Sequence, residues 1–302
     1  MKSMDLLLLI VGGMTAAMGS SMVFADDSVA GGAKGEPSMK NPASPFDNPS
    51  VLAAVFHPRP EGAVSAGGFE NLTIPVGDGV TLGGRFYSAG TNNPTMLFFH
   101  GNGEIVADYS DLAHAYTCMG INFMPLDYRG YGRSSGVPTL TTMLKDAHLA
   151  FDFARRWLTD HGYAGSFIVM GRSLGSASAL ELAAAHTNEI DGLIIDSGFA
   201  DTLALLERCG WRPVPGQAVT DTLFRHAEKI RLYKGPTLII HGTRDTIIPI
   251  ADAEALYQAS GGTSKRLLRI RGAGHNNLMA IGSDEYFQAV LSIVQNRAKA
   301  ER

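Results

Sequence analysis

Eight short apolar runs, most of them separated by stretches long enough for a helix, constrain the fold of this chain most strongly. The runs cover residues 69–75, 81–87, 96–100, 121–126, 167–170, 193–196, 237–241 and 266–270. The first two are joined by Gly-Asp-Gly at 77–79, which is typical of a hairpin turn, whereas parallel strands need longer crossovers. We therefore expect an α/β fold with an eight-stranded, mostly parallel sheet and helices on both faces. The expected helices cover residues 139–161, 173–186, 252–260 and 284–298.

Composition limits the classes of function. The chain has 302 residues, of which 45% are hydrophobic, enough to bury the core of one large domain. Its 25 basic and 29 acidic residues form no long charged block, so nucleic acid is not an expected partner. Cys118 and Cys209 lie far apart, and no zinc-type spacing of Cys and His occurs. We expect two core thiols, with a disulfide as the alternative, and no metal site.

The first 25 residues are typical of a secretory signal peptide. Lys2 precedes an apolar stretch, and Val23 and Ala25 are small residues at the −3 and −1 positions of a cleavage site. Cleavage after Ala25 predicts a secreted or periplasmic protein without stable membrane insertion. The alternative is a membrane anchor, because residues 6–25 are just long enough to span the hydrocarbon at ~1.5 Å per residue.

Residues 26–50 are rich in Gly, Ala, Ser, Asn and Pro and contain few large apolar residues. Such a segment buries too little surface to offset the entropy of ordering it, so a flexible linker is expected. Residues 51–302 would then form a single domain.

Gly-Arg-Ser-Leu-Gly at 171–175 lies between the fifth apolar run and an alanine-rich helical stretch. A serine in a tight strand-to-helix turn needs small neighbours on both sides, which Gly171 and Gly175 provide. The pattern predicts a nucleophile elbow with Ser173 as the nucleophile. A plain Gly/Ser turn is the alternative.

A serine nucleophile needs a base and a carboxylate that orients the base. Asp245 follows the seventh apolar run, and His275 lies in a glycine-flanked loop after the eighth. Each residue alone could be an ordinary turn or surface residue. Together with Ser173 they follow the order Ser, Asp, His that an elbow of this type requires. Asp196, at the end of the sixth run, is the competing candidate for the acid.

A glycine-rich loop, His-Gly-Asn-Gly at 100–103, follows the third apolar run. The backbone N–H groups of Asn102 and Leu174 are the candidate oxyanion-hole donors. A simple helix-capping turn is the alternative. The loop lacks the third glycine of GxGxxG, and no GxxxxGK[ST] loop occurs, so no nucleotide cofactor is expected.

Five segments together resemble the α/β-hydrolase-domain serine hydrolases. They are Phe-His-Gly-Asn-Gly at 99–103, Asp-Tyr-Arg-Gly-Tyr-Gly-Arg-Ser at 127–134, the elbow at 171–175, His-Gly-Thr-Arg-Asp at 241–245 and Gly-His at 274–275. The second segment is similar to that of depalmitoylating thioesterases, lysophospholipid or monoacylglycerol lipases and serine aminopeptidase-like proteins. The resemblance covers the chain from about residue 69. It implies the α/β-hydrolase fold, with Ser173 as nucleophile, His275 as general base and acid, and Asp245 as the orienting carboxylate. Acyl transfer by these residues needs no cofactor.

About 40 residues separate the sixth and seventh runs, and a crossover helix must occupy part of them, which leaves a minimal lid. Apolar residues of this segment could line an acyl pocket or form the packing core of the lid; they are Leu203, Leu206, Trp211, Val214, Leu223 and Phe224. The core interpretation is favoured.

We therefore expect a serine hydrolase that cleaves esters or thioesters of a small or lipid-like acyl substrate. One alternative is a serine aminopeptidase-like enzyme, in which Glu207 or Asp221 would hold the substrate ammonium group. The other is a non-catalytic binding protein on the same scaffold.

Overall fold

The computed structural model describes residues 45–62, 67–212 and 223–295. The predicted signal peptide lies outside these ranges, and so do residues 26–44 of the predicted linker. Residues 45–50, expected at the end of the linker, instead form the 3₁₀ helix η1 (Pro45–Asp47) and the start of α2 (Pro49–Val55). The Asn48 side chain caps α2 by accepting a hydrogen bond from Val51 N, and Pro49 occupies its first position.

The eight strands form one sheet in the order β1-β2-β4-β3-β5-β6-β7-β8. The strands are β1 (Glu70–Pro75), β2 (Thr81–Phe86), β3 (Thr95–Phe99), β4 (Asn122–Leu126), β5 (Phe167–Arg172), β6 (Gly192–Asp196), β7 (Thr237–Gly242) and β8 (Lys265–Ile270). Strand β2 pairs antiparallel with β1 and β4, and the remaining pairs are parallel. The predicted α/β fold, with its antiparallel entry and parallel crossovers, is confirmed.

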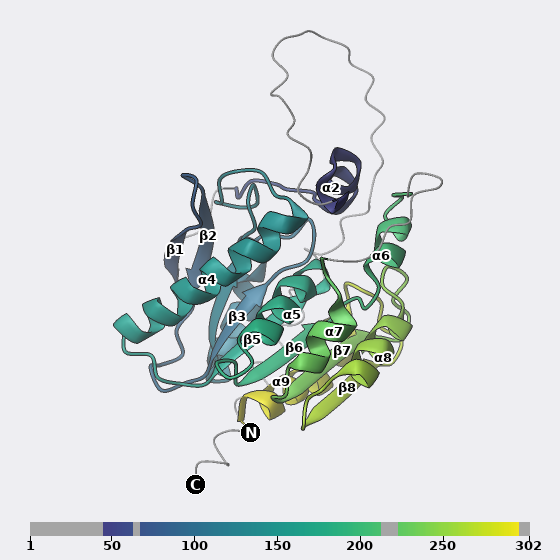
Figure 1. Ribbon diagram of the computed structural model, residues 1–302. Helices are drawn as coiled ribbons and strands as arrows, with labels where there is room; N and C mark the ends of the chain where they lie inside the picture. The colour runs from purple at the N-terminus through teal and green to yellow at the C-terminus, as the bar shows by residue number, and fades with distance from the viewer. Residues whose placement is uncertain (1–44, 63–66, 213–222, 296–302) are drawn as a thin grey trace, which may run out of the picture.

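Helices cover both faces of the sheet (Figure 1). They are η2 (Val106–Tyr109), α3 (Ser110–Cys118), α4 (Leu140–Asp160), η3 (Ser173–Gly175), α5 (Ser176–Ala185), α6 (Thr202–Arg208), α7 (His226–Leu232), α8 (Ile250–Ala259) and α9 (Leu278–Gln295). Helices α4, α5, α7 and α8 contribute to one core cluster, and α3 and α9 contribute to the other. Successive side chains of β3 enter opposite clusters, Leu97 and Phe99 on one face and Met96 and Phe98 on the other.

Besides α2, helices α3 and α9 differ from the sequence-based expectation. Helix α3 is not among the expected helices, because it is only nine residues long and weakly amphipathic. Helix α9 begins at Leu278, six residues before the predicted start, with a break in helical geometry at Gly282. An alanine Cβ at Gly282 would lie 2.7 Å from the side chain of Ile270, so the glycine lets α9 pass close to β8.

The cysteine prediction is wrong. Both Cys118 and Cys209 are free and exposed, at or near the ends of α3 and α6, so neither is a core thiol and no disulfide joins them. In the part of the chain that the structure describes, none of the helices combines the length and the apolar character needed to cross a membrane.

Candidate active site

The predicted site residues meet at the carboxyl edge of the parallel strands. Ser173 follows β5, Asp245 follows β7, His275 follows β8 and the Asn102 loop follows β3. The chain goes from β3 outward to β4 and then returns to β5 on the other side of β3. Ligands of open α/β sheets bind at such a switch point, outside the carboxyl ends of the strands.

Ser173 has the strained geometry of an elbow. Its φ of 50° lies in the left-handed region, which residues other than Gly, Asn and Asp rarely adopt. A Cβ on Gly171 would lie 2.3 Å from the carbonyl oxygen of Gly175, and a Cβ on Gly175 would lie 2.1 Å from that of Phe99. The two glycines therefore allow the turn to close against the end of β3, while Ser173 stays partly exposed.

The imidazole of His275 lies between the serine and the carboxylate. Its Nε2 is 2.9 Å from Ser173 Oγ, and its Nδ1 is 2.7 Å from Asp245 Oδ2. Because a carboxylate can only accept, Nδ1 carries the proton of the neutral ring, and Nε2 is left to accept the hydroxyl hydrogen. This arrangement prepares His275 to remove a proton from Ser173.

The two oxygens of Asp245 have different partners. Oδ1 accepts hydrogen bonds from the backbone N–H groups of Ile247 (2.9 Å) and Ile248 (2.8 Å). Oδ2 faces His275 and, at 3.3 Å, Nε2 of His241. Burial opposes ionisation, but the hydrogen bonds from His241 and His275 outweigh it and hold the pKa of Asp245 well below its usual range. The group is therefore a carboxylate near neutral pH.

His241, near the end of β7, is a further member of this cluster, to which the sequence analysis gives no role of its own. It is completely buried, and its Nε2 lies 2.7 Å from the carbonyl oxygen of Ile248. Burial favours the neutral ring, but the hydrogen bonds to Asp245 and to the Ile248 carbonyl dominate and raise the pKa of His241.

Asp196 does not reach His275. Its Oδ2 accepts from Tyr286 Oη at 2.8 Å, and its Oδ1 accepts from Ser197 Oγ at 2.9 Å. These bonds tie the end of β6 to α9. Asp196, the competing candidate for the acid, therefore holds α9 against the sheet.

The loop with the first candidate oxyanion donor forms a β-turn. Glu104 N donates to Gly101 O at 3.4 Å, and Gly103 at the third position has a φ of 73°. Within residues 45–62, 67–212 and 223–295, the Asn102 backbone N–H has no hydrogen-bond acceptor. Leu174 lies in the first turn of η3, where amides lack an intrahelical acceptor. Both predicted donors are thus available to a ligand.

Arg172, directly before Ser173, joins the loops around the site. It is buried, and it forms an ion pair with Glu104. Its Nη2 donates to His275 O at 3.1 Å and to Asn276 Oδ1 at 2.8 Å. Glu104 also accepts from Gly101 N at 2.6 Å and from the Tyr109 hydroxyl. Burial alone would raise the pKa of Glu104, but Arg172 reverses this and keeps it below its usual value.

The sequence-based reasoning did not identify the role of Arg172. A charged residue two positions after the apolar run 167–170 was the available signal, because a charge at the end of a buried strand needs a partner.

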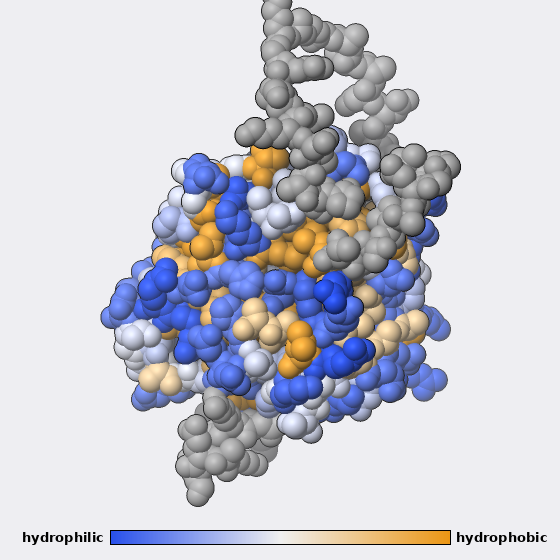
Figure 2. Space-filling model, in the orientation of Figure 1, coloured by the Kyte–Doolittle hydropathy of each residue, from blue (hydrophilic) through white to orange (hydrophobic). Residues whose placement is uncertain are grey.

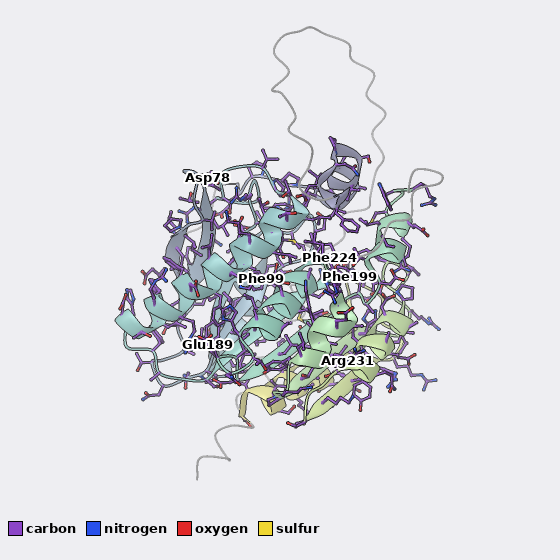
Figure 3. All side chains as sticks on the ribbon, viewed as in Figure 1. Asp78, Phe99, Glu189, Phe199, Phe224 and Arg231 are labelled. Carbon is purple, nitrogen blue, oxygen red and sulfur yellow. The ribbon has the colours of Figure 1, made fainter. Side chains whose placement is uncertain are left out.

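In the segment between β6 and α7 the structure describes residues 197–212 and 223–225, whose apolar side chains pack in or against a core cluster. Leu206 and Phe224 are fully buried, and Phe224 packs on Phe199 with ring centroids 6.1 Å apart (Figure 3). Leu203, Trp211 and Leu223 are only partly buried against the same cluster. The core interpretation therefore holds for two of the predicted residues. Val214 and Asp221 lie outside the described residues.

Apolar surface is visible between α2, α5 and α6, on the side of the molecule where the parallel strands end (Figure 2). In the described ranges, no group of three or more His, Cys, Asp or Glu side chains is placed to hold a metal ion.

The sequence is similar to those of several known proteins. Residues 90–205 match the family described as serine aminopeptidase, S33. Protein bem46 of Schizosaccharomyces pombe is 25% identical over 74% of this chain and 75% of its own length. The α/β hydrolase domain-containing protein aho-3 of Caenorhabditis elegans is 28% identical over 69% of this chain and 59% of its own.

Solved structures show the same fold. An esterase of Pyrococcus furiosus superposes with a TM-score of 0.65 at 19% identity, over 80% of this chain and 98% of that one. The Butyrivibrio proteoclasticus esterase Est1E, solved with ferulic acid, gives a TM-score of 0.60 at 19% identity, over 73% of this chain and 99% of its own. The sheet order and these structures show that the chain has the α/β-hydrolase fold, and its residues 90–205 are similar to the serine aminopeptidase family.

Proposed function

We propose that this protein is a serine hydrolase that cleaves carboxylic ester or thioester bonds through an acyl-enzyme on Ser173. The observation that carries the proposal is the continuous hydrogen-bonded line from Ser173 Oγ through His275 to Asp245, with contacts of 2.9 and 2.7 Å. The S33 family match and the esterase neighbours are consistent with a hydrolase.

In the proposed reaction His275 Nε2 takes the hydroxyl proton as Ser173 Oγ attacks the substrate carbonyl carbon. The N–H groups of Asn102 and Leu174 stabilise the oxyanion of the tetrahedral intermediate. His275 then gives its proton to the leaving alcohol or thiol. Water, deprotonated by the same imidazole, releases the acid and restores Ser173. The steps need no metal or organic cofactor.

Asp245 keeps His275 in the tautomer that can accept from serine, and it stabilises the imidazolium that forms. The carboxylate can do so at neutral pH because four donors surround it: two backbone amides and two imidazoles.

The substrate is proposed to be a small or lipid-like acyl compound that binds beside Ser173. A secreted or periplasmic location is proposed from the sequence of residues 1–25 alone. A peptidase is the second candidate, because the matched family is described as serine aminopeptidase. Of the two anions considered for an α-ammonium group, Glu207 is exposed on α6 and Asp221 is not described.

Hydrolysis of p-nitrophenyl esters of increasing acyl length tests the proposal, with the full chain compared with Ser173→Ala. We expect turnover that the substitution reduces by about 10⁶-fold, with an optimum acyl length that reports the size of the pocket. Aminoacyl p-nitroanilides, assayed in parallel, test the peptidase. Cleavage of the anilides and not of the esters would favour the second candidate; no cleavage of either would favour a binding protein.

A further inference from the structure

Residues 56–61, here called the strap, follow α2 and cross the loop that carries Asn102. The strap begins from a fixed point, because Val55 and Phe56 are both buried in the main core cluster. Pro58 and Pro60 stiffen it, since proline fixes its own φ and holds the preceding residue in extended geometry. His57 is therefore presented from a rigid segment, although its side chain is exposed.

The strap binds the Asn102 side chain with both its backbone and its imidazole. The backbone N–H of His57 donates to Asn102 Oδ1 at 2.9 Å, and Asn102 Nδ2 lies 2.7 Å from His57 Nδ1. The hydroxyl of Tyr131, which is fully buried, donates to the same Oδ1 at 2.8 Å and accepts from His57 N at 2.8 Å.

These contacts determine the orientation of the amide. A backbone N–H can only donate, so the atom next to His57 N must be the oxygen of Asn102. The Asn102 NH₂ group then faces His57 Nδ1 and donates to it, so Nδ1 must be unprotonated. The imidazole thus acts as an acceptor that fixes one specific position of the Asn102 side chain.

A second set of contacts ties the strap to the same region. Arg59 Nε donates to Gly103 O at 2.8 Å, next to Asn102. Gly132 N donates to Arg59 O at 2.9 Å, and Glu61 N donates to Gly132 O at 3.1 Å, next to Tyr131. The loop after β3 is thus held between the strap and the loop after β4.

We propose that His57 is a positioning residue that holds Asn102 and thereby aims its backbone N–H at the oxyanion. The inference rests on the proposed function and extends it to a segment outside the family match, which begins at residue 90. The strap acts through Asn102, and its imidazole does not touch the reacting atoms.

The test compares three variants of the full chain. His57→Leu removes the acceptor, whereas His57→Asn puts an oxygen on the atom that corresponds to Cγ of histidine and so restores it. His161→Leu is the matched control, because His161 is also exposed and its ring makes a single hydrogen bond, to Trp157 O at 2.7 Å, at the end of α4. Hydrogen exchange of the peptide spanning residues 98–106 and ester kinetics are measured for each variant.

We expect faster exchange of this peptide in His57→Leu and a kcat about tenfold lower, with KM within about twofold. A loss smaller than the 10²–10³ of a deleted donor is expected because the amide is displaced and not removed. His57→Asn should recover most of both changes, and His161→Leu should match the wild type.

Unchanged exchange in His57→Leu, or equal losses in the Leu and Asn variants, would overturn the inference. Faster exchange with an unaltered kcat would also overturn it, because the loop would then be held without aiding catalysis. If the wild type hydrolyses no ester, the proposed function fails. The proposed effect of His57 on kcat then fails as well. The exchange rates alone would then decide whether His57 holds the loop.

Discussion

At the scale of single residues, Asp245 combines two roles that sequence-based reasoning treats as alternatives. One oxygen closes the turn by binding Ile247 N and Ile248 N, and the other binds His275. The turn fixes the carboxylate in place, so the orientation of His275 is determined by the backbone after β7. Asp196 has no such relation to His275 and binds Tyr286 instead.

The substitution Asp245→Asn should therefore lower kcat by about 10⁴-fold, because an amide in this position favours the wrong tautomer of His275. Asp196→Asn, the matched change on the neighbouring strand, should lower the unfolding temperature and leave kcat within about threefold of wild type. Steady-state ester kinetics and thermal unfolding distinguish the two. A larger loss of kcat in Asp196→Asn would contradict the assignment of the acid.

Ser173 stores backbone strain, because its φ is 50°. A left-handed conformation costs about 1–2 kcal/mol for a residue with a Cβ and almost nothing for glycine. Ser173→Gly should therefore be about 1 kcal/mol more stable than Ser173→Ala in urea unfolding, although both should be inactive.

The same pair of changes at Ser178, inside α5, provides the control. There glycine should be about 1 kcal/mol less stable than alanine, because it loses more conformational freedom in a helix. Equal stability of the Gly and Ala variants at Ser173 would show that the elbow carries no strain.

At the scale of elements, the last residue of β5 holds together the loops after β3 and β8. Arg172 at the end of β5 pairs with Glu104 from the loop after β3 and binds His275 O in the loop after β8. The side chain thus spans the elbow and both flanking loops. A buried ion pair of this kind adds little net stability, but removal of one partner leaves an uncompensated charge.

Arg172→Met should destabilise the fold by about 3–5 kcal/mol, because Glu104 would remain buried without its counter-charge. The double variant Arg172→Met/Glu104→Gln should regain part of that loss, since the glutamine is neutral and its amide oxygen can still accept from Gly101 N. Urea unfolding of both single variants and the double variant measures the coupling. Additive losses would show that the two side chains act independently.

The sequence predicts elements better than it predicts the contacts between them. All eight strands begin and end within two residues of the predicted positions, because each is a compact apolar run bounded by turns or charged residues. Helix α9 begins before its expected first residue, 284, because Gly282 interrupts the apolar pattern from which the helix is predicted. The triad candidates could be identified because each follows a strand, and parallel strands bring their carboxyl ends together.

The Arg172 network and the strap could not be predicted in this way. Arg172 and Glu104 are 68 positions apart, and His57 and Asn102 are 45 apart, so no local periodicity links them. Such pairs depend on the relative positions of whole elements. The exposed cysteines are a similar case: each lies at a helix end, where a small shift decides whether a side chain is covered.

At the scale of the whole molecule, a charged cluster joins the helices on one face of the sheet. Glu181 on α5 lies 3.2 Å from His148 Nε2 on α4 and 2.5 Å from Lys229 Nζ on α7. The hydrogen bond with His148, helped by Lys229 and opposed by burial, lowers the pKa of Glu181 from 4.5 to about 2.

Because the pKa of Glu181 is lower in the folded state, its stabilising effect is complete above about pH 4.5 and is lost as the pH falls toward 2. Glu181→Gln should lower the free energy of unfolding by about 1–3 kcal/mol at pH 7. The difference in the free energy of unfolding between the variant and the wild type should shrink as the pH falls from about 4.5 toward 2. Urea unfolding at a series of pH values measures this difference, with Glu254→Gln as the control, because Glu254 pairs with Arg269 at an exposed site away from the cluster. A difference that stays constant down to pH 2 would contradict the assignment.

The central claim, that Ser173 is the activated nucleophile of the molecule, is tested most directly by covalent trapping. The full chain is treated with a fluorophosphonate, and the modified residue is located by mass spectrometry. We predict a single adduct on Ser173, formed much more slowly in His275→Ala although its serine is intact. No adduct, or an adduct on another serine with Ser173 unmodified, would contradict the account.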